Sequence, residues 1–283
     1  MLKKLLLWCY KIISKFYIRP QPSGFGLGAL KDDEDKKDYS VGIVGEIDIP
    51  AEIDMRTYVP EIKSQGRLNS CIPHAICSSI ELQINMQDPK RYVPLSELYN
   101  YYYGRMESNL FPKDSGTYPR DAIKSIKSKG IALEVAHPYS VEFFNRPPSS
   151  AAESVAHIYS ALTKEYFRVF TDVDMMEKLA LGLPIIISVP VYSYWHYPKL
   201  NQTIQSPITG LQERIIVTRP DGIIRKPDKS DTLEGYHALC VVGYDKKGWI
   251  CLNSWGRNYG DKGFVYLPYG YEMIDKWVII LEA

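Results

Sequence analysis

The chain has 283 residues, and its 34 basic and 33 acidic side chains give a formal net charge of +1. This balance leaves no global field that would attract nucleic acid, so a nucleic-acid partner is not expected. Hydrophobic residues make up 45% and charged residues 24% of the chain, which is typical of globular proteins and excludes a fibrous or disordered body. The length suffices for one large domain or two lobes that each bury a core.

The five cysteines are odd in number and lack the spacing of a zinc site. A disulfide framework is therefore not expected, because secreted domains held by disulfides usually carry more cysteines in even number. We expect no metal, no cofactor and at least one free thiol among Cys9, Cys71, Cys77, Cys240 and Cys251.

The first 20 residues begin like a signal peptide, but Lys11 interrupts the apolar run and no small-residue cleavage site follows. Apolar residues recur at helical spacing between Leu2 and Phe16, which predicts a basic amphipathic helix over residues 2–17. This helix is too short and too charged to span a bilayer, but it could dock on the protein or contact a membrane surface weakly. These features favour an intracellular or virion-associated protein over a secreted one.

A solvated linker is predicted next, where a glycine-rich stretch precedes the charge run of residues 31–38. Globular composition begins at about Ile49. A helix is predicted from Cys71, because Pro73 is tolerated only in a first turn, and further helices are predicted at residues 95–103, 119–129 and 174–181. Strands are predicted in the second half, at residues 184–192, 213–218, 237–245, 248–255, 263–269 and 276–283. A helical first half and a β-rich second half indicate the α+β class.

Cys71 stands at the N-terminus of its predicted helix, where the helix dipole and a neighbouring imidazole would favour a thiolate. A lone cysteine in this position is more often a small buried residue, so its sequence context decides. Gln65 precedes it by six residues, and Gly66 permits a turn between them. The Gln65 amide and the first N–H of the helix could therefore converge on a developing oxyanion.

His237 opens a predicted strand, and Asn253 ends the next one. The Asn253 amide oxygen could accept a hydrogen bond from the imidazole, and Trp255 is placed to shield that bond from water. The other histidines carry no such context: His74 is expected to be structural, and no role is assigned to His137, His157 or His196.

The segments SQGRLNSC, YHALCVVGYD and LNSWGRNYGDKGF occur in this order and resemble the three active-site blocks of papain-like (C1) cysteine peptidases. The resemblance implies Cys71 as nucleophile, His237 as acid and base, Asn253 as the residue that orients His237, and Gln65 as the donor to the scissile carbonyl. It also implies that Ser115, Gly116 and Trp255 bind substrate.

The same resemblance implies a two-lobed papain-like fold with the active-site cleft between the lobes. The expected division is a propeptide-like segment at residues 1–48, a helical lobe with the nucleophile at residues 49–160, and a β-barrel-like lobe with the histidine and asparagine at residues 161–283.

Two departures from the family pattern narrow this expectation. Leu68 and Ile72 stand where the family commonly has a cysteine and an aromatic residue, so the usual local disulfide cannot form, as in microbial and viral members. The separation of Cys71 and His237, 237 − 71 = 166 residues, exceeds the roughly 130–150 typical of the family. An insertion at residues 194–233 is expected, either shaping the leaving-group side of the cleft or forming a disordered surface loop.

The expected function is a cysteine endopeptidase that works through a thioester on peptide or protein substrates, as a monomer. Its N-terminus would either inhibit the enzyme as part of a zymogen or attach it to a membrane. The same residues would also serve an acyl transferase or an isopeptidase, and a peptide-binding module without activity remains a further alternative.

Overall fold

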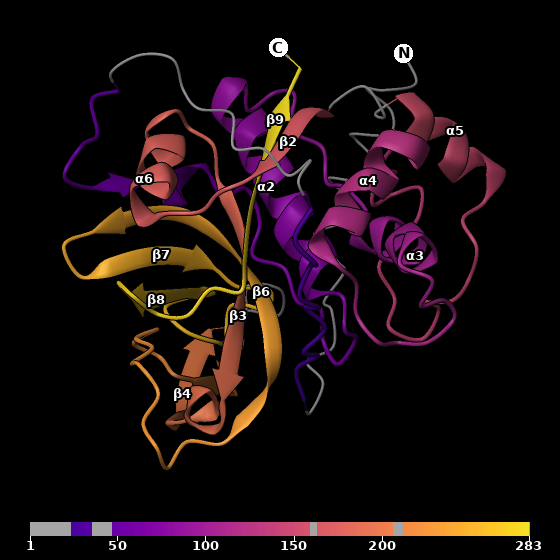
Figure 1. Ribbon diagram of the computed structural model, residues 1–283. Coiled ribbons are helices and arrows are strands. Elements are labelled where there is room, and N and C mark those ends of the chain that lie inside the picture. Colours follow the sequence, from indigo (N-terminus) through magenta and orange to yellow (C-terminus); the bar gives the residue numbers. More distant parts are fainter. Residues whose placement is uncertain (1–23, 36–46, 159–162, 206–211, 283) are drawn as a thin grey trace.

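The computed structural model describes residues 24–35, 47–158, 163–205 and 212–282, so the helix expected over residues 2–17 lies outside it. Two lobes lie side by side, one made of helices and the other of an antiparallel sheet, and α2 (Cys71–Gln87) runs between them (Figure 1). This arrangement confirms the α+β, two-lobed fold expected from the sequence. None of the helices in the described ranges is long and apolar enough to cross a membrane.

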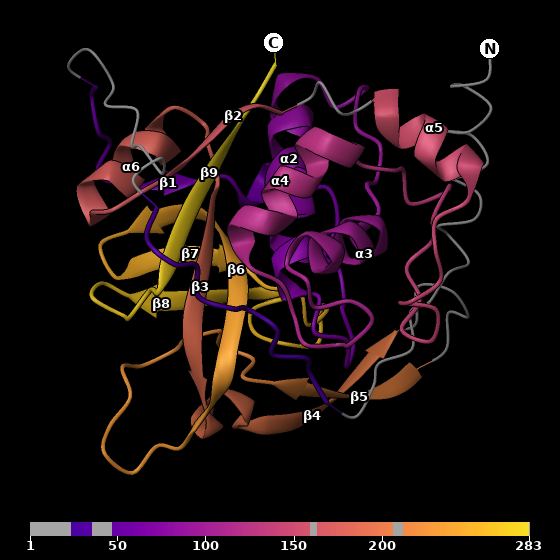
Figure 2. The ribbon, with the colours of Figure 1, turned by 45° about the vertical axis from the view of Figure 1, so that its right-hand side comes forward.

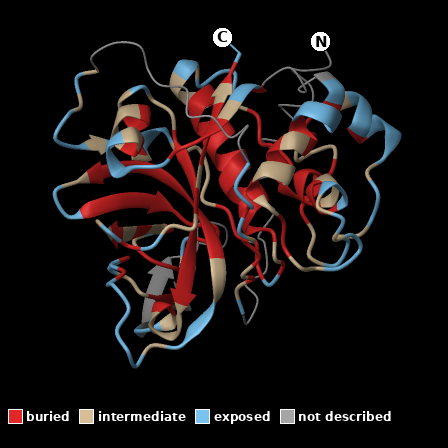
Figure 3. Ribbon diagram, in the orientation of Figure 1, coloured by how far each residue is buried: buried red, intermediate tan, exposed pale blue. Residues whose placement is uncertain are grey.

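The helical lobe packs around α2, in which every residue from Cys71 to Ile84 is buried (Figure 3). The other helices of this lobe are α3 (Glu97–Glu107), α4 (Pro119–Lys129) and α5 (Ser150–Ile158), preceded by the short 3-10 helix η1 (Arg56–Tyr58). Ser96 caps α3 by accepting a hydrogen bond from the Tyr99 N–H, and Gly130 ends α4 with a positive φ of 73°.

The large sheet has the strand order β2-β9-β3-β6-β7-β8, and β1 pairs with β6. All pairings are antiparallel. The strands are β1 (Ile53–Asp54), β2 (Thr163–Arg168), β3 (Ile185–Tyr192), β6 (Leu233–Asp245), β7 (Gly248–Leu252), β8 (Phe264–Pro268) and β9 (Asp275–Leu281), with α6 (Asp172–Ala180) between β2 and β3. Residues 53 and 54, which the expected division assigned to the helical lobe, thus pair within the sheet.

The expected insertion is folded where the structure describes it. It contains the 3-10 helix η3 (Ser193–His196) and the two-stranded sheet of β4 (Lys199–Gln205) and β5 (Gln212–Thr218), which lies below the large sheet in Figure 2. The Thr218 N–H donates to the Asn258 carbonyl at 2.9 Å, and the Gly260 N–H donates to Thr218 at 2.8 Å. The insertion is therefore joined to the loop that follows β7.

A buried ion cluster forms around Lys63. Its ammonium is 2.6 Å from Glu81 on α2 and also contacts Glu97 on α3, and all three side chains are at most 3% exposed. Burial raises the pKa of Glu81 to about 7. The positive charge of Lys63 lowers this pKa in part, and the negative charge of Glu97 raises it further. The Lys63 carbonyl also accepts from the N–H of Gly256, in the loop after β7, at 3.0 Å. The backbone at Lys63 is therefore joined to the sheet lobe, while its side chain binds the helical lobe.

Candidate active site

Cys71 is the first residue of α2, and it is completely buried. The backbone N–H groups of Ala238, Gly28 and Ile72 face its sulfur and favour the thiolate. Ala238 is the residue after His237 on β6, so the sheet brings the predicted acid and base to the helix N-terminus.

His237 and Asn253 form the second part of the site. The His237 Nε2 is 2.8 Å from the Asn253 Oδ1, which also accepts from the Ser254 N–H at 2.7 Å. Because an amide oxygen only accepts, Nε2 carries the proton of a neutral imidazole. Nδ1 has no hydrogen-bond partner among the described residues, so it is the nitrogen available for proton exchange with Cys71.

Gln65 is held from three directions. Its Oε1 accepts from the Ser254 hydroxyl at 2.6 Å, and its backbone N–H donates to the Ser254 carbonyl at 2.8 Å. Its Nε2 donates to the Leu68 carbonyl at 2.8 Å and to the Gly26 carbonyl at 3.1 Å. The amide nitrogen predicted to hold a scissile carbonyl therefore already holds a carbonyl of the chain itself.

Gly26 belongs to residues 24–35, here called the covering segment, which runs as an extended chain across the junction of the lobes (Figure 2). The sequence predicted this stretch to be a solvated linker, and that prediction is wrong for its described part. Backbone and side-chain groups on both lobes bind it: Gly26 N to Gly66 O (3.1 Å), Leu27 N to Asn69 Oδ1 (2.9 Å), Ala29 N to Tyr236 O (3.3 Å), Thr117 N to Gly28 O (3.1 Å) and Leu30 N to Thr117 O (3.2 Å).

Two glycines of the covering segment allow this close approach. A Cβ on Gly26 would lie 2.2 Å from the Leu68 carbonyl oxygen, and one on Gly28 would lie 2.0 Å from the Asn69 carbonyl oxygen. A Cβ on Gly24 would meet nothing within 4 Å. The segment thus fits against the catalytic residues only with glycine at positions 26 and 28.

Comparison with known proteins identifies this arrangement. The sequence profile of the papain family cysteine protease matches residues 49–276. The chain belongs to the papain family of cysteine proteases. An uncharacterized peptidase C1-like protein of Acanthamoeba polyphaga mimivirus is 28% identical over 244 residues, which are 81% of this chain and 70% of that protein. Cysteine proteinase 1 of Dictyostelium discoideum is 24% identical over 245 residues, 78% of this chain and 62% of that protein.

Solved structures agree with this assignment. Xylellain, a cysteine protease from Xylella fastidiosa, has a TM-score of 0.74 and 27% identity, and the match covers 94% of this chain and all of xylellain. The bromelain protease from Ananas comosus, in complex with the E64 inhibitor, shares the fold with a TM-score of 0.60, 21% identity and coverage of 83% of this chain. The viral and bacterial relatives support the expected likeness to microbial and viral papain-like proteases.

Two of the three residues expected to bind substrate, Gly116 and Trp255, lie at the covering segment. Gly116 has a positive φ of 85°, and a Cβ there would lie 2.0 Å from the Gly28 carbonyl oxygen. Its neighbour Thr117, which the sequence analysis missed, makes two of the backbone hydrogen bonds to the segment: it donates to Gly28 and accepts from Leu30. The Ser115 hydroxyl has no hydrogen-bond partner in the described part of the chain. The Trp255 ring lies 4.4 Å from the His237 ring and carries Phe25 on its surface.

The far end of the covering segment is held by charged groups. The Asp32 N–H donates to the Asp275 carboxylate at 3.0 Å, and the Asp32 carboxylate accepts from the Arg120 N–H at 3.0 Å. Asp275 also pairs with Arg168. Burial raises the pKa of Asp32 from 3.8 to about 7, against the Arg120 N–H, which lowers it, while the neighbouring Asp275 raises it further.

Burial keeps the catalytic pair uncharged. Burial raises the pKa of Cys71 to about 11, although the surrounding N–H groups act in the opposite direction. Burial lowers the pKa of His237 to about 3, which the hydrogen bond to Asn253 only partly offsets. At neutral pH the site therefore holds a thiol and a neutral imidazole rather than the reactive ion pair.

Other cysteine and histidine positions follow from the packing. Cys77, Cys240 and Cys251 are buried free thiols, and Leu68 fills the place of the family's disulfide partner with 1% exposure. His74 turns its Nδ1 to the Ser70 carbonyl at 2.9 Å, which fits a structural role. His196 was given no role, yet its ring lies 5.9 Å from that of Trp255. No sequence signal marks it, because the insertion brings it there through tertiary contacts.

Proposed function

We propose that this chain is a cysteine endopeptidase made as a zymogen, with the covering segment as its inhibitor. The observation that carries the proposal is that the Gly26 carbonyl accepts a hydrogen bond from the Gln65 Nε2 at 3.1 Å, while the Gly28 N–H faces the Cys71 sulfur. A substrate that needs the same donor and the same thiol cannot bind until the segment leaves.

The proposed reaction follows from the groups at the site. Cys71, deprotonated by His237, attacks the scissile carbonyl, and the Gln65 amide with the Cys71 N–H stabilises the oxyanion. His237 then protonates the leaving amine, and a thioester remains on Cys71. Water, deprotonated by His237, attacks the thioester, and the thiol returns with release of the acid product. Asn253 keeps the imidazole in the required tautomer through the 2.8 Å contact.

The direction of the covering segment supports inhibition over self-cleavage. In a productive peptide the residue after the scissile carbonyl carries the leaving amine and lies toward His237. Here the residue before the Gly26 carbonyl, Phe25, lies on Trp255, whose ring is 4.4 Å from that of His237. The segment therefore runs in the direction opposite to that of a productive substrate. The Leu27 nitrogen, which follows the Gly26 carbonyl, donates to the Asn69 Oδ1 and is not presented to His237.

A pair of glycine variants tests the inhibition in the full chain. Gly28→Ala places a Cβ 2.0 Å from the Asn69 carbonyl oxygen and should expel the segment, whereas Gly24→Ala meets nothing within 4 Å. We expect peptidase activity of the Gly28→Ala chain to exceed that of the wild type by roughly tenfold or more, and that of the Gly24→Ala chain to match the wild type. Equal activity of all three chains would remove the inhibitory role and leave the peptidase reaction in place.

A matched cysteine pair tests the reaction itself. In the Gly28→Ala chain, Cys71→Ala should abolish hydrolysis of peptides and labelling by a thiol-directed epoxide, while Cys77→Ala, which alters another buried cysteine of α2, should retain both. Hydrolysis that persists without Cys71 would contradict the proposed mechanism. Labelling of Cys71 without cleavage of any peptide would favour a peptide-binding module. Transfer of the acyl group to an added amine in preference to water would favour an acyl transferase.

A further inference from the structure

We propose that His196, held by Glu234, is a specificity residue of this enzyme. With Trp255 and Tyr259 it forms a three-ring site, here called the aromatic site, that accepts an aromatic side chain from the leaving-group side of the substrate. This inference rests on the proposed peptidase function and names the class of substrate that the enzyme prefers.

Phe25 of the covering segment marks the site by occupying it. Its ring is stacked on Trp255 with a centroid distance of 4.6 Å and an interplanar angle of 12°. It meets Tyr259 edge to face at 5.5 Å, and its plane lies within 10° of that of His196 at 6.2 Å. Two rings of the loop after β7, Trp255 and Tyr259, thus present a stacked face and an edge to the Phe25 ring, and His196 of η3 adds a parallel neighbour.

The position of Trp255 assigns the aromatic site to the leaving-group side. The Trp255 ring contacts the imidazole of His237 at 4.4 Å, and His237 is the group that protonates the leaving amine. The residues that follow the scissile bond must pass this imidazole. Their side chains are therefore the ones that reach Trp255 once Phe25 has left.

The walls of the aromatic site are fixed by buried contacts. The Tyr259 hydroxyl donates to the Trp195 carbonyl at 2.8 Å, and the Trp195 indole donates to the Tyr271 hydroxyl at 3.1 Å. Trp195, Trp255 and Tyr259 are fully buried while the segment is in place. The site therefore keeps its shape without ordering new side chains, which favours binding of a rigid ring.

His196 is held in position by groups of the insertion and of β6. Its Nε2 is 2.7 Å from the Glu234 carboxylate at the start of β6, which fixes the orientation of the ring. Arg219 donates to the carbonyls of Tyr194 and Tyr197 on either side of it, at 3.0 and 2.6 Å.

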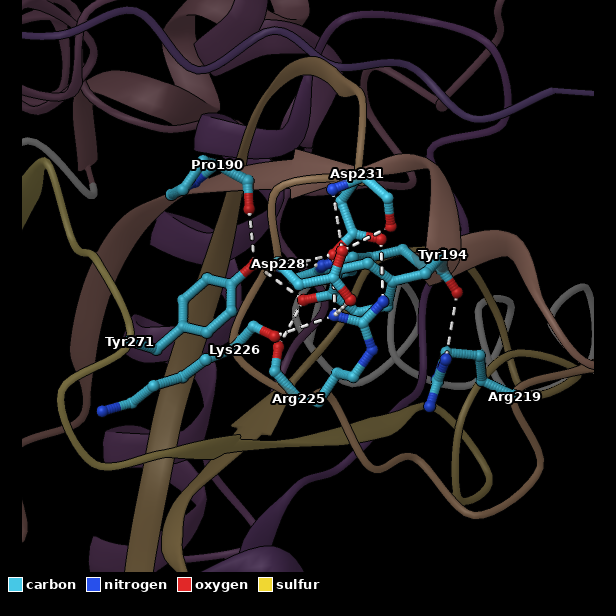
Figure 4. A network of polar contacts seen from close by, with 10 residues as sticks. Pro190, Tyr194, Arg219, Arg225, Lys226, Asp228, Asp231 and Tyr271 are labelled. Carbon is cyan, nitrogen blue, oxygen red and sulfur yellow. Dashed lines mark hydrogen bonds and ion pairs between the residues drawn. The ribbon is translucent and has the colours of Figure 1, made fainter.

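Figure 4 shows a second arginine, Arg225, next to Tyr194 of η3. Arg225 lies 4.1 Å from the centroid of the Tyr194 ring and binds both oxygens of Asp231 at 2.7 Å. Tyr271 in turn donates to the Pro190 carbonyl on β3 at 2.9 Å. The insertion thus connects η3, which carries His196, firmly to the large sheet.

The expected consequence is a preference for aromatic over aliphatic side chains of similar size. Leucine would bury a comparable apolar area on Trp255 but would lose the ring stacking and the edge contact. The difference corresponds to a roughly three- to tenfold change in kcat/KM, by the usual strength of aromatic pairs.

The test uses the full chain with Gly28→Ala and peptides that carry Phe, Leu or Ala at the first or second position after the scissile bond. The parent should cleave the Phe peptide better than the Leu peptide at one of these positions. The ratio of their kcat/KM values should fall toward one in His196→Ala and fall partly in Glu234→Gln. His157→Ala, at an exposed histidine of α5, should leave the ratio unchanged.

The outcomes separate this inference from the proposed function. A Phe to Leu ratio of one in the parent, or a ratio that both His196→Ala and Glu234→Gln leave unchanged, overturns the inference while the peptidase reaction stands. A loss of the ratio in His157→Ala as well would also overturn it. A peptide methyl ester, whose leaving group has no side chain, provides the second readout: if the parent fails to hydrolyse it, the proposed function itself fails.

Discussion

At one end of the covering segment an uncharged ring, Phe25, lies on buried aromatic rings. At the other end the Asp32 backbone N–H donates to the Asp275 carboxylate, and the Asp32 carboxyl group is buried. The aromatic end gains its stability from shape and apolar contact, and the Phe25 ring itself does not titrate. The acidic end depends on a proton, because burial disfavours the charged form of the Asp32 carboxyl group and the negative charge of Asp275 raises its pKa further. The two ends therefore hold the same segment under different conditions.

The largest effect is expected at the aromatic end. Phe25→Ala in the full chain removes the stacking on Trp255, and because Phe25 is only partly buried the loss should be about 2 kcal/mol, roughly half that of a core phenylalanine. Release of the segment should then raise peptidase activity roughly 30-fold. Initial rates at pH 5 and pH 8 should give the same ratio of variant to wild type.

Phe143→Ala is the matched control, because Phe143 is a phenylalanine of the helical lobe with 53% exposure. Its activity should equal that of the wild type. An unchanged activity of the Phe25→Ala chain, or a ratio that changes with pH, would contradict the view that this end is held by shape alone.

A smaller, pH-dependent effect is expected at the acidic end. The pKa of Asp32 is raised from 3.8 to about 7 in the bound segment, so its proton stabilises binding fully below about pH 4, and this contribution is lost as the pH rises to 7. Asp32→Asn mimics the protonated form. Wild type and variant should be inhibited equally at pH 4, and the variant should be roughly tenfold less active than the wild type at pH 8.

Comparing the wild type with Asp32→Asn separates the effect of the Asp32 proton from the effects of other titrating groups at the site. The lowered pKa of His237 acts in the opposite direction, since its neutral form in the covered state disfavours binding of the segment at low pH. Both chains share that effect, so it cancels in their ratio. Asp32 faces Asp275 on β9, Arg120 on α4 and Arg168 on β2, and these stay unchanged. A ratio that is constant from pH 4 to pH 8 would show that Asp32 does not control binding of the segment.

The smallest effect is expected at Arg120, whose side chain donates to the exposed Asp33 carbonyl at 2.6 Å. Arg120→Met removes this bond and the guanidinium charge near Asp32, but it keeps the backbone N–H that holds Asp32. We expect a gain in activity below about fivefold, because an exposed hydrogen bond contributes only about 1 kcal/mol. A gain as large as that of Phe25→Ala would reverse the proposed order of the two ends. Activity assays of both variants in parallel decide this.

The features predicted best from the sequence are those that residues close together in the chain determine, such as helix ends and the catalytic blocks. Pro119 and Gly130 bound α4 as predicted, because proline in a first turn and glycine with a positive φ are local requirements. The catalytic residues were predicted as a group because each lies in a distinctive block, and the structure brings His237, Asn253 and Gln65 into one hydrogen-bonded arrangement through Ser254. Ser254 itself went unnoticed within its block.

The features missed by the sequence analysis depend on distant contacts. Glycines and charges in residues 24–38 favour a linker locally, and only the surfaces around Asn69 and Asp275 show why Gly28 and Asp32 are buried against them. The edge strand β2 was missed because Lys164 and Glu165 are exposed and interrupt the apolar pattern. His196 reaches Trp255 through the packing of an insertion, which no local pattern encodes.

The Lys63 cluster has a consequence for how this protein changes over evolutionary time. One ammonium and two carboxylates are buried where the stretch before Gln65 joins both lobes. Loss of Lys63 leaves two buried carboxylates without a cation, and loss of either carboxylate removes a partner of the buried ammonium. Single substitutions there should be eliminated, and the three positions should change only together. Descendants of this chain are thus expected to diversify on the exposed surface of the insertion long before the three positions of the Lys63 cluster change.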